Sequence, residues 1–130
     1  MSNKTEPTVR KKMVKRISLL TRKEGMSKDE FLSHWNDHLP ISHDVPGLRR
    51  YVLSHIISEP QRADVPVHWD LGEVDGIAET WFDSQEATDK AFQSPEGKRW
   101  LAHGASFIGR QKTFVVQEEV VISGTDAQLL

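Results

Sequence analysis

The sequence contains no cysteine among its 130 residues. This absence excludes disulfides, thiolate nucleophiles, cysteine-based zinc fingers and iron–sulfur ligation. Glycine-rich phosphate loops of the GxGxxG or P-loop type are also missing, so no nucleotide cofactor is expected. No GxSxG motif of a serine hydrolase occurs either. Histidine, present six times, is therefore the main candidate for chemistry.

Long apolar runs and an excess of one charge are absent as well. No run approaches the roughly 18–20 apolar residues needed to cross a bilayer, and the N-terminus carries no apolar signal core. Seventeen basic residues balance 19 acidic ones, which argues against a nucleic-acid footprint. We therefore expect a soluble, cytoplasmic protein with no membrane or nucleic-acid partner.

The chain has the length of one domain. We place that domain at residues 12–123, between a polar, disordered lead-in at 1–11 and a tail at 124–130. Branched and alternating apolar residues predict the strands, which are 13–21, 48–57, 77–82 and 111–122.

Capping signals predict the helices. Ser27 and Glu30 form a capping box for a helix that we expect to end near His38, because Pro40 disfavours helical geometry in the residue before it. A second capping box begins at Asp83. A third helical segment begins at 94–95, where serine precedes proline.

The resulting β-α-β-β-α-β order predicts a ferredoxin-like α+β fold, with helices on one face of a four-stranded antiparallel sheet. The expected strands at 48–57 and 111–122 are apolar on both faces, so the second face needs a cover as well. The simplest cover is another copy of the same sheet, which predicts a homodimer.

His38 is the strongest catalytic candidate. It shares one face of its helix with Phe31 and Trp35, so it should point inward. Burial disfavours the charged imidazole and the helix end favours it, a balance that can place the pKa near neutral and suit acid–base chemistry. The alternative is a histidine that only caps the helix and packs.

Other residues give weaker signals. His34, His38 and His43 could suggest a metal, but no acidic residue completes a zinc-protease pattern, so we expect none. In the strand at 77–82, a slip of one residue would exchange Glu79 for Thr80 on the inner face. The long segment at 58–75 contains His68 and is expected to be a lid or pocket wall rather than a spacer.

Two segments carry a family resemblance. ISLLTRKEGMSKDEFLSHWNDHLP followed by PGLRRYV resembles the opening of the EthD family. AETWFDSQEA and then FIGRQKTFVVQEEVV resemble its 4-methylmuconolactone methylisomerase branch. The resemblance covers residues 13–121 and implies a dimeric α+β barrel, with His38 pointing into a pocket and Tyr51 nearby. That branch has a cysteine where this chain has Thr80, so a thiol mechanism is excluded here.

These observations predict a cofactor-independent enzyme that moves a proton in an isomerisation or cyclisation of a small lactone, aromatic or polyketide-like acid. His38 would be the acid–base, and Tyr51 and Thr80 would orient oxygens. The expected substrate-binding residues are the aromatic and imidazole side chains Trp35, His55, His68, Trp81, His103 and Phe107. The alternatives are a non-catalytic accessory protein of an oxidative degradation pathway and a cofactor-free oxygenase.

Overall fold

A computed structural model describes residues 13–65 and 73–124 of the chain. The expected lead-in at 1–11 lies outside these residues, as does all but the first residue of the expected tail at 124–130. In the described part, no helix is long and apolar enough to cross a membrane.

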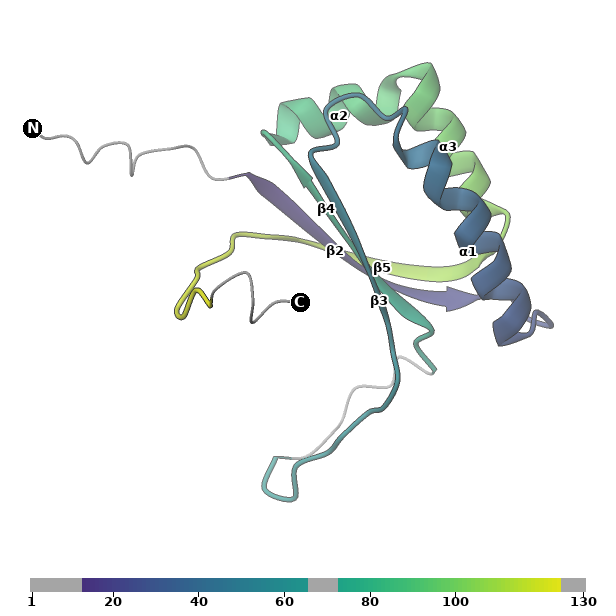
Figure 1. Ribbon diagram of the computed structural model, residues 1–130, viewed down its shortest axis with the longest axis vertical. Helices are drawn as coiled ribbons and strands as arrows, with labels where there is room; N and C mark the ends of the chain where they lie inside the picture. Colours follow the sequence, from purple (N-terminus) through teal and green to yellow (C-terminus); the bar gives the residue numbers. More distant parts are fainter. Residues whose placement is uncertain (1–12, 66–72, 125–130) are drawn as a thin grey trace, which may run out of the picture.

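One four-stranded antiparallel sheet, in the order β3-β4-β2-β5, carries all the described helices on one side (Figure 1). Its strands are β2 (Val14–Arg22), β3 (Arg50–His55), β4 (Gly76–Phe82) and β5 (Ile108–Val116). The helices are α1 (Lys28–Ser42), α2 (Gln85–Gln93) and α3 (Pro95–Ala105). This arrangement confirms the predicted ferredoxin-like α+β fold.

The register decides which side chains meet the helices. Arg16 is paired with Thr80, and the next positions along, Lys15 and Trp81, are also paired. Because successive residues of a strand point to opposite faces, the two pairs lie on different sides of the sheet. Thr80 lies on the helix-covered face, and Glu79 on the other, here called the open face. The uncertainty between these two residues is thereby resolved.

Helix α1 begins as predicted but ends later. Ser27 accepts a hydrogen bond from the Glu30 backbone N–H, and the Glu30 carboxylate accepts one from the Ser27 N–H. The predicted end near His38 is wrong, because the helix continues through Pro40 to Ser42. Burial of Ser42 and a hydrogen bond from its hydroxyl to a carbonyl in the preceding turn stabilise the extra residues.

Helices α2 and α3 follow each other through a shared serine. Ser94 caps α3 by accepting a hydrogen bond from the Gly97 N–H, as the serine–proline pair predicts. The predicted cap of α2 is wrong by one residue, since Ser84 accepts from the Ala87 N–H. Asp83 instead forms a bidentate ion pair with Arg49.

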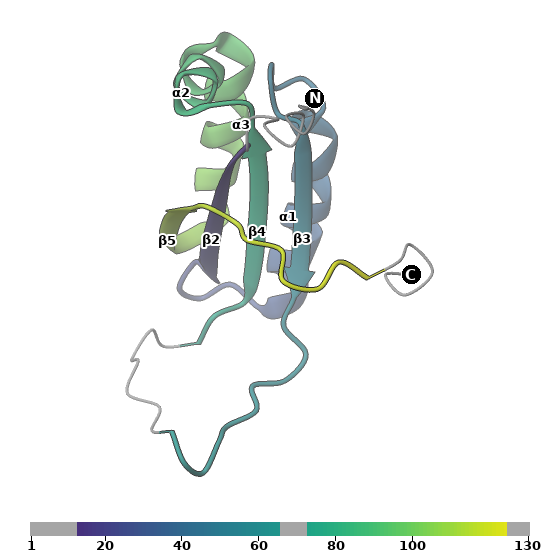
Figure 2. The same cartoon turned by 90° about the vertical axis from the view of Figure 1, so that its left-hand side faces the viewer.

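Strand β5 is displaced from its predicted position. It begins at Ile108 and ends at Val116 instead of covering 111–122. Val116 pairs with Lys15 near the start of β2, so residues beyond it have almost no strand left to pair with. Residues 117–124 cross the open face instead, as Figure 2 shows for the yellow segment. Strand β3 is also shorter than expected, because only Arg50–His55 has a partner in β4.

The buried core consists of separate clusters around a cavity. One contains Leu20, Phe31, Trp35 and Phe107, and the other contains Val45, Phe82, Ala91 and Trp100. Leu20, Trp35 and Trp100 from these clusters also line the cavity. The core therefore borders a space between the helix-covered face and the helices.

Candidate active site

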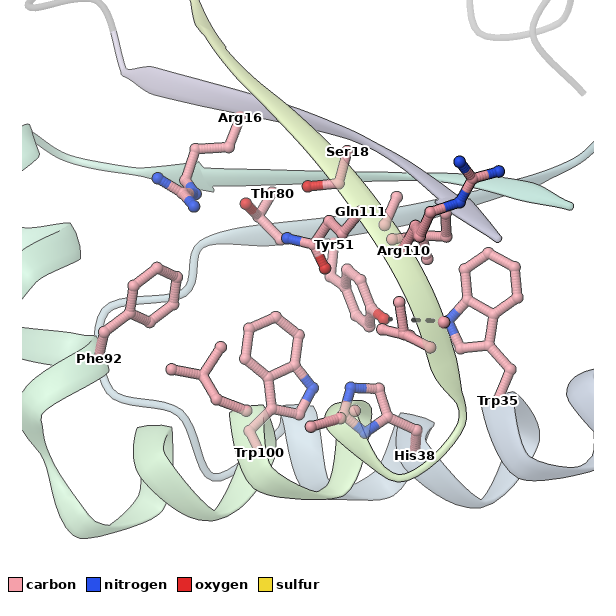
Figure 3. A pocket seen from close by; sticks show the side chains of 17 residues that line it. Arg16, Ser18, Trp35, His38, Tyr51, Thr80, Phe92, Trp100, Arg110 and Gln111 are labelled. Atoms are coloured by element: carbon pink, nitrogen blue, oxygen red, sulfur yellow. Dashed lines mark hydrogen bonds between the residues drawn. The ribbon is translucent and has the colours of Figure 1, made fainter. Parts of the chain in front are cut away.

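A cavity of about 290 Å³ lies between the helix-covered face of the sheet and the helices. This volume is at the lower end of the roughly 300–1,000 Å³ typical of small-molecule pockets. Figure 3 shows its two contrasting walls. The sheet wall is polar and includes Arg16, Ser18, Tyr51, Thr80 and Gln111. The helix wall is mainly aromatic and includes Trp35, His38, Phe92 and Trp100.

His38 comes from α1 and is held between other rings. Its imidazole is stacked on Trp100, with ring centroids 5.3 Å apart and planes within 6°, and contacts the edge of Phe107 at 5.4 Å. The residue is only 5% exposed but lines the cavity. Packing thus fixes the ring in one plane beside the space that a ligand would occupy.

Burial, together with the neighbouring His103, which disfavours a second positive charge, lowers the pKa of His38 to about 4. The prediction of a near-neutral pKa is therefore wrong. That prediction needed the negative end of the helix at His38, but α1 continues to Ser42. At neutral pH the ring is uncharged and able to accept a proton.

The two imidazoles are joined by their Nδ1 atoms, which lie 2.9 Å apart. A hydrogen bond at that distance requires one ring to donate and the other to accept, so the neutral pair shares one hydrogen between these atoms. If His38 donates, its Nε2 is an unprotonated base; if His103 donates, the Nε2 of His38 carries a proton. The pair can therefore exist in a base form and an acid form.

Tyr51 presents a proton to the cavity. Its oxygen accepts a hydrogen bond of 3.3 Å from Trp35 Nε1, which leaves the phenolic O–H free to donate elsewhere. Burial raises the pKa of Tyr51, and the bond from Trp35 partly offsets that rise. The phenol is therefore neutral at physiological pH and can orient a ligand oxygen.

Thr80 lies on β4, is 7% exposed and lines the same cavity. Its hydroxyl has no hydrogen-bond partner among residues 13–65 and 73–124. Beside it, Ser18 and Thr113 share a 2.8 Å hydrogen bond, and Gln111 Nε2 donates to the Thr113 hydroxyl. The sheet wall thus combines a fixed polar network with a hydroxyl available to a ligand.

Four of the predicted site residues meet at the cavity: Trp35, His38, Tyr51 and Thr80. His103 lies behind His38 and does not line the space. Phe107, another expected wall, is fully buried beneath the histidines and supports them from the core.

Trp81, His55 and His68 lie elsewhere. Trp81 is on the open face, where its Nε1 donates to Glu118 at 3.2 Å. His55 is exposed at the end of β3 and contacts the edge of Trp35 from outside the cavity. His68 lies outside the described residues, and none of the described part of the 58–75 segment lines the cavity.

Thirteen of the 17 lining residues were absent from the predicted site, among them Arg16, Phe92 and Trp100. None of these three was assigned a role from the sequence. The sequence could have indicated part of the role of Arg16. An arginine within a strand of branched apolar residues must point to one of the two faces of the sheet. Which face it takes depends on the pairing with Thr80.

No group of three or more potential metal ligands comes together in the described part of the chain. His34 instead stacks on Phe107, and His43 caps the end of α1. The expectation of a cofactor-free protein stays a prediction.

A family model and a curated relative match this chain. The model of the methylmuconolactone methyl-isomerase family matches residues 13–122. The 4-carboxymethyl-4-methylbutenolide mutase of Pseudomonas reinekei is 35% identical over 108 residues, which are 83% of this chain and 100% of that protein.

Solved structures agree on the fold. An EthD-family protein from Bacillus halodurans has a TM-score of 0.65 and 27% identity, over 82% of this chain and 99% of its own. A protein from Bacteroides fragilis, described as dimeric with a ferredoxin-like fold, has a TM-score of 0.59 and 14% identity, over 82% and 96%. The resemblance drawn from the sequence is thereby confirmed.

Proposed function

The chain belongs to the methylmuconolactone methyl-isomerase family, and from this premise we propose that it is a cofactor-independent isomerase of small lactones. The observation that carries the proposal is His38, a neutral imidazole held against a small cavity and bonded through Nδ1 to a second histidine. A buried base beside hydrogen-bond donors is suited to proton transfer on a lactone.

The proposed reaction moves one proton within the substrate. A C–H bond breaks, its electron pair stays in the lactone, and the proton passes to Nε2 of His38. The hydrogen on Nδ1 can shift toward His103 while the first ring is protonated, which spreads the positive charge over both rings. The proton then returns to another atom of the same substrate, so atoms and electrons balance without an oxidant or reductant.

Tyr51 and Thr80 complete the proposed site. The phenolic O–H and the threonine hydroxyl both border the cavity and can donate to the lactone oxygens as negative charge builds up there. Thr80 occupies the position at which the sequence comparison implies a cysteine in relatives. We propose that it orients the substrate and does not form a covalent bond.

The test is turnover of 4-carboxymethyl-4-methylbutenolide, the compound named for the Pseudomonas reinekei relative, followed by proton NMR. We expect His38→Ala to lower kcat by at least about 100-fold, the usual contribution of a positioned acid–base. His43→Ala is the matched control, because it removes an exposed histidine just beyond the same helix. Full turnover by His38→Ala would contradict the proposal.

The two alternative functions give different results in the same assay. An accessory protein would bind the lactone and leave it unchanged, with or without His38. A cofactor-free oxygenase would consume oxygen with an electron-rich phenol, which an oxygen electrode detects. We expect neither outcome, because the hydrogen-bonded pair of His38 and His103 can remove a proton from the substrate and then return it.

We also propose that the protein is a homodimer through the open face. This face carries partly buried apolar side chains, including Ile17, Leu19 and Ile77, without a helix layer over them. Phe114 on β5 lies on the same face and is 39% exposed. Covering such a surface with a second copy removes apolar area from water. The cytoplasmic location stays a prediction.

A further inference from the structure

Arg16 is a positive charge inside the wall of the cavity. It lies on β2, and the register with Thr80 directs its side chain toward the helices. Its guanidinium lies 5.0 Å from the ring centroid of Phe92, a cation–π contact that holds it at one end of the space (Figure 3). His38 lies beyond Trp100 on the same aromatic wall, so the two groups border different parts of one cavity.

Arg16 takes part in none of the ion pairs of the described residues. Asp89 exerts a longer-range attraction on its guanidinium. Burial lowers the pKa of Arg16, which shows that the guanidinium is partly removed from water. Arginine nevertheless stays charged, so its partly desolvated donors lack a hydrogen-bonded partner of opposite sign within the described residues.

Other donors around the same cavity also lack acceptors. Trp100 is 7% exposed, and its buried indole Nε1 has no hydrogen-bond partner in the described structure. The O–H of Tyr51 and the hydroxyl of Thr80 are available as described above. An excess of donors over acceptors selects a ligand rich in oxygen acceptors.

We propose that Arg16 is the specificity-determining residue that binds the carboxylate of the substrate, so that it selects an acidic lactone over a neutral one. The planar guanidinium fits a carboxylate through two parallel hydrogen bonds. The remaining part of the substrate then packs on Phe92 and Trp100, with its reactive ring directed toward His38. This proposal rests on the proposed function for the identity of the ring, but its charge recognition is independent of turnover.

The test compares an acid with its neutral ester. The probes are carboxymethyl-substituted saturated γ-butyrolactone, which lacks the double bond needed for isomerisation, and its methyl ester. Isothermal titration calorimetry gives both Kd values. We expect the unmodified protein to bind the acid about 10- to 100-fold more tightly, the usual effect of charge-assisted hydrogen bonds. Arg16→Met should bring the two Kd values within about threefold.

Three further proteins complete the experiment. Arg16→Lys keeps the charge without the planar fork and should retain part of the preference for the acid. Lys98→Met removes an exposed positive charge outside the cavity and should retain all of it. If Arg16→Met does not fold by circular dichroism, Arg16→Gln replaces it in the comparison.

The outcomes separate this inference from the proposed function. No preference for the acid, or a preference that survives loss of Arg16, overturns the role of Arg16 even if His38-dependent turnover is found. An Arg16-dependent preference in a protein that converts no lactone supports the role of Arg16 and contradicts the isomerase. Binding of neither probe by the unmodified protein overturns the inference.

Discussion

The two faces of the sheet surround neighbouring positive charges with different partners. Lys15 and Arg16 are consecutive residues of β2, yet they point to opposite faces. On the open face, Lys15 Nζ lies 2.8 Å from carboxylate oxygens of both Glu79 and Glu118. On the helix-covered face, Arg16 has an aromatic contact with Phe92 but no ion pair in the described part of the chain.

This difference separates a structural charge from a functional one. Lys15 is 9% exposed, and its interactions with the two carboxylates outweigh the effect of burial, so that its pKa is raised. A buried cation that is satisfied within the protein has no need of a ligand. Arg16 borders the cavity without an ion pair among the described residues, as expected where a ligand brings the opposite charge.

The largest effect is expected on dimerisation, from a substitution that tests whether the open face is the dimer interface. In Phe114→Glu, a negative charge would replace an apolar side chain in the proposed dimer contact, which should weaken dimerisation by about 100-fold or more. Sedimentation velocity across micromolar concentrations measures the change. Leu32→Glu is a matched control, because Leu32 is 38% exposed against 39% for Phe114 but lies on α1. A monomeric unmodified protein would contradict the dimer.

A smaller effect is expected from exchanging the two cations for methionine. Lys15→Met leaves two carboxylates without their shared partner and should lower the free energy of unfolding by ~2–3 kcal/mol. Arg16→Met removes no ion pair within the described residues and should change it by less than about 1 kcal/mol. Urea unfolding followed by circular dichroism measures both. Equal losses would remove the contrast between the faces.

The smallest effect is expected at Glu118, the more exposed of the two carboxylates that contact Lys15. Glu118 is about half exposed, and hydrogen bonds from Lys15 and then Trp81 lower its pKa. Because the pKa is lower in the folded state, the ionised carboxylate stabilises the protein at pH values above the unfolded pKa of about 4.3. This stabilisation is lost as the pH falls through the folded pKa. Glu118→Gln should therefore cost under about 1 kcal/mol at pH 7.

Urea unfolding at several pH values provides the measurement for Glu118. The difference between Glu118→Gln and the unmodified protein should shrink as the pH falls below about 4. Glu59→Gln, which changes an exposed glutamate in the loop after β3, is the control and should show no such trend. A difference that is constant with pH would mean that the charge of Glu118 is not involved.

Local signals in the sequence predicted much of the fold. The capping box at Ser27 and Glu30 and the serine–proline start of α3 are formed as expected, because a cap depends only on residues within one turn. The order of strands and helices also follows from local patterns. Helix α1 ran past its predicted end because packing around Ser42 outweighs the local preference set by Pro40.

The site was predictable only where the orientation of a side chain followed from the helix or strand that carries it. His38 shares a helix face with Phe31 and Trp35, so its inward direction could be derived. The direction of Arg16 could not be derived, since a strand offers two faces and the choice depends on its neighbours in the sheet. The pairing of His38 with His103 joins residues 65 positions apart, a separation that no local pattern specifies.

By itself, the sequence determined the absence of thiol chemistry, the order of the elements and the inward direction of one histidine. Tertiary structure decided that Lys15 meets two carboxylates while Arg16 meets none within the described residues, and that His38 is paired and uncharged at neutral pH. Composition and periodicity act along the chain, whereas charge balance and pKa depend on which distant groups come within a few ångströms.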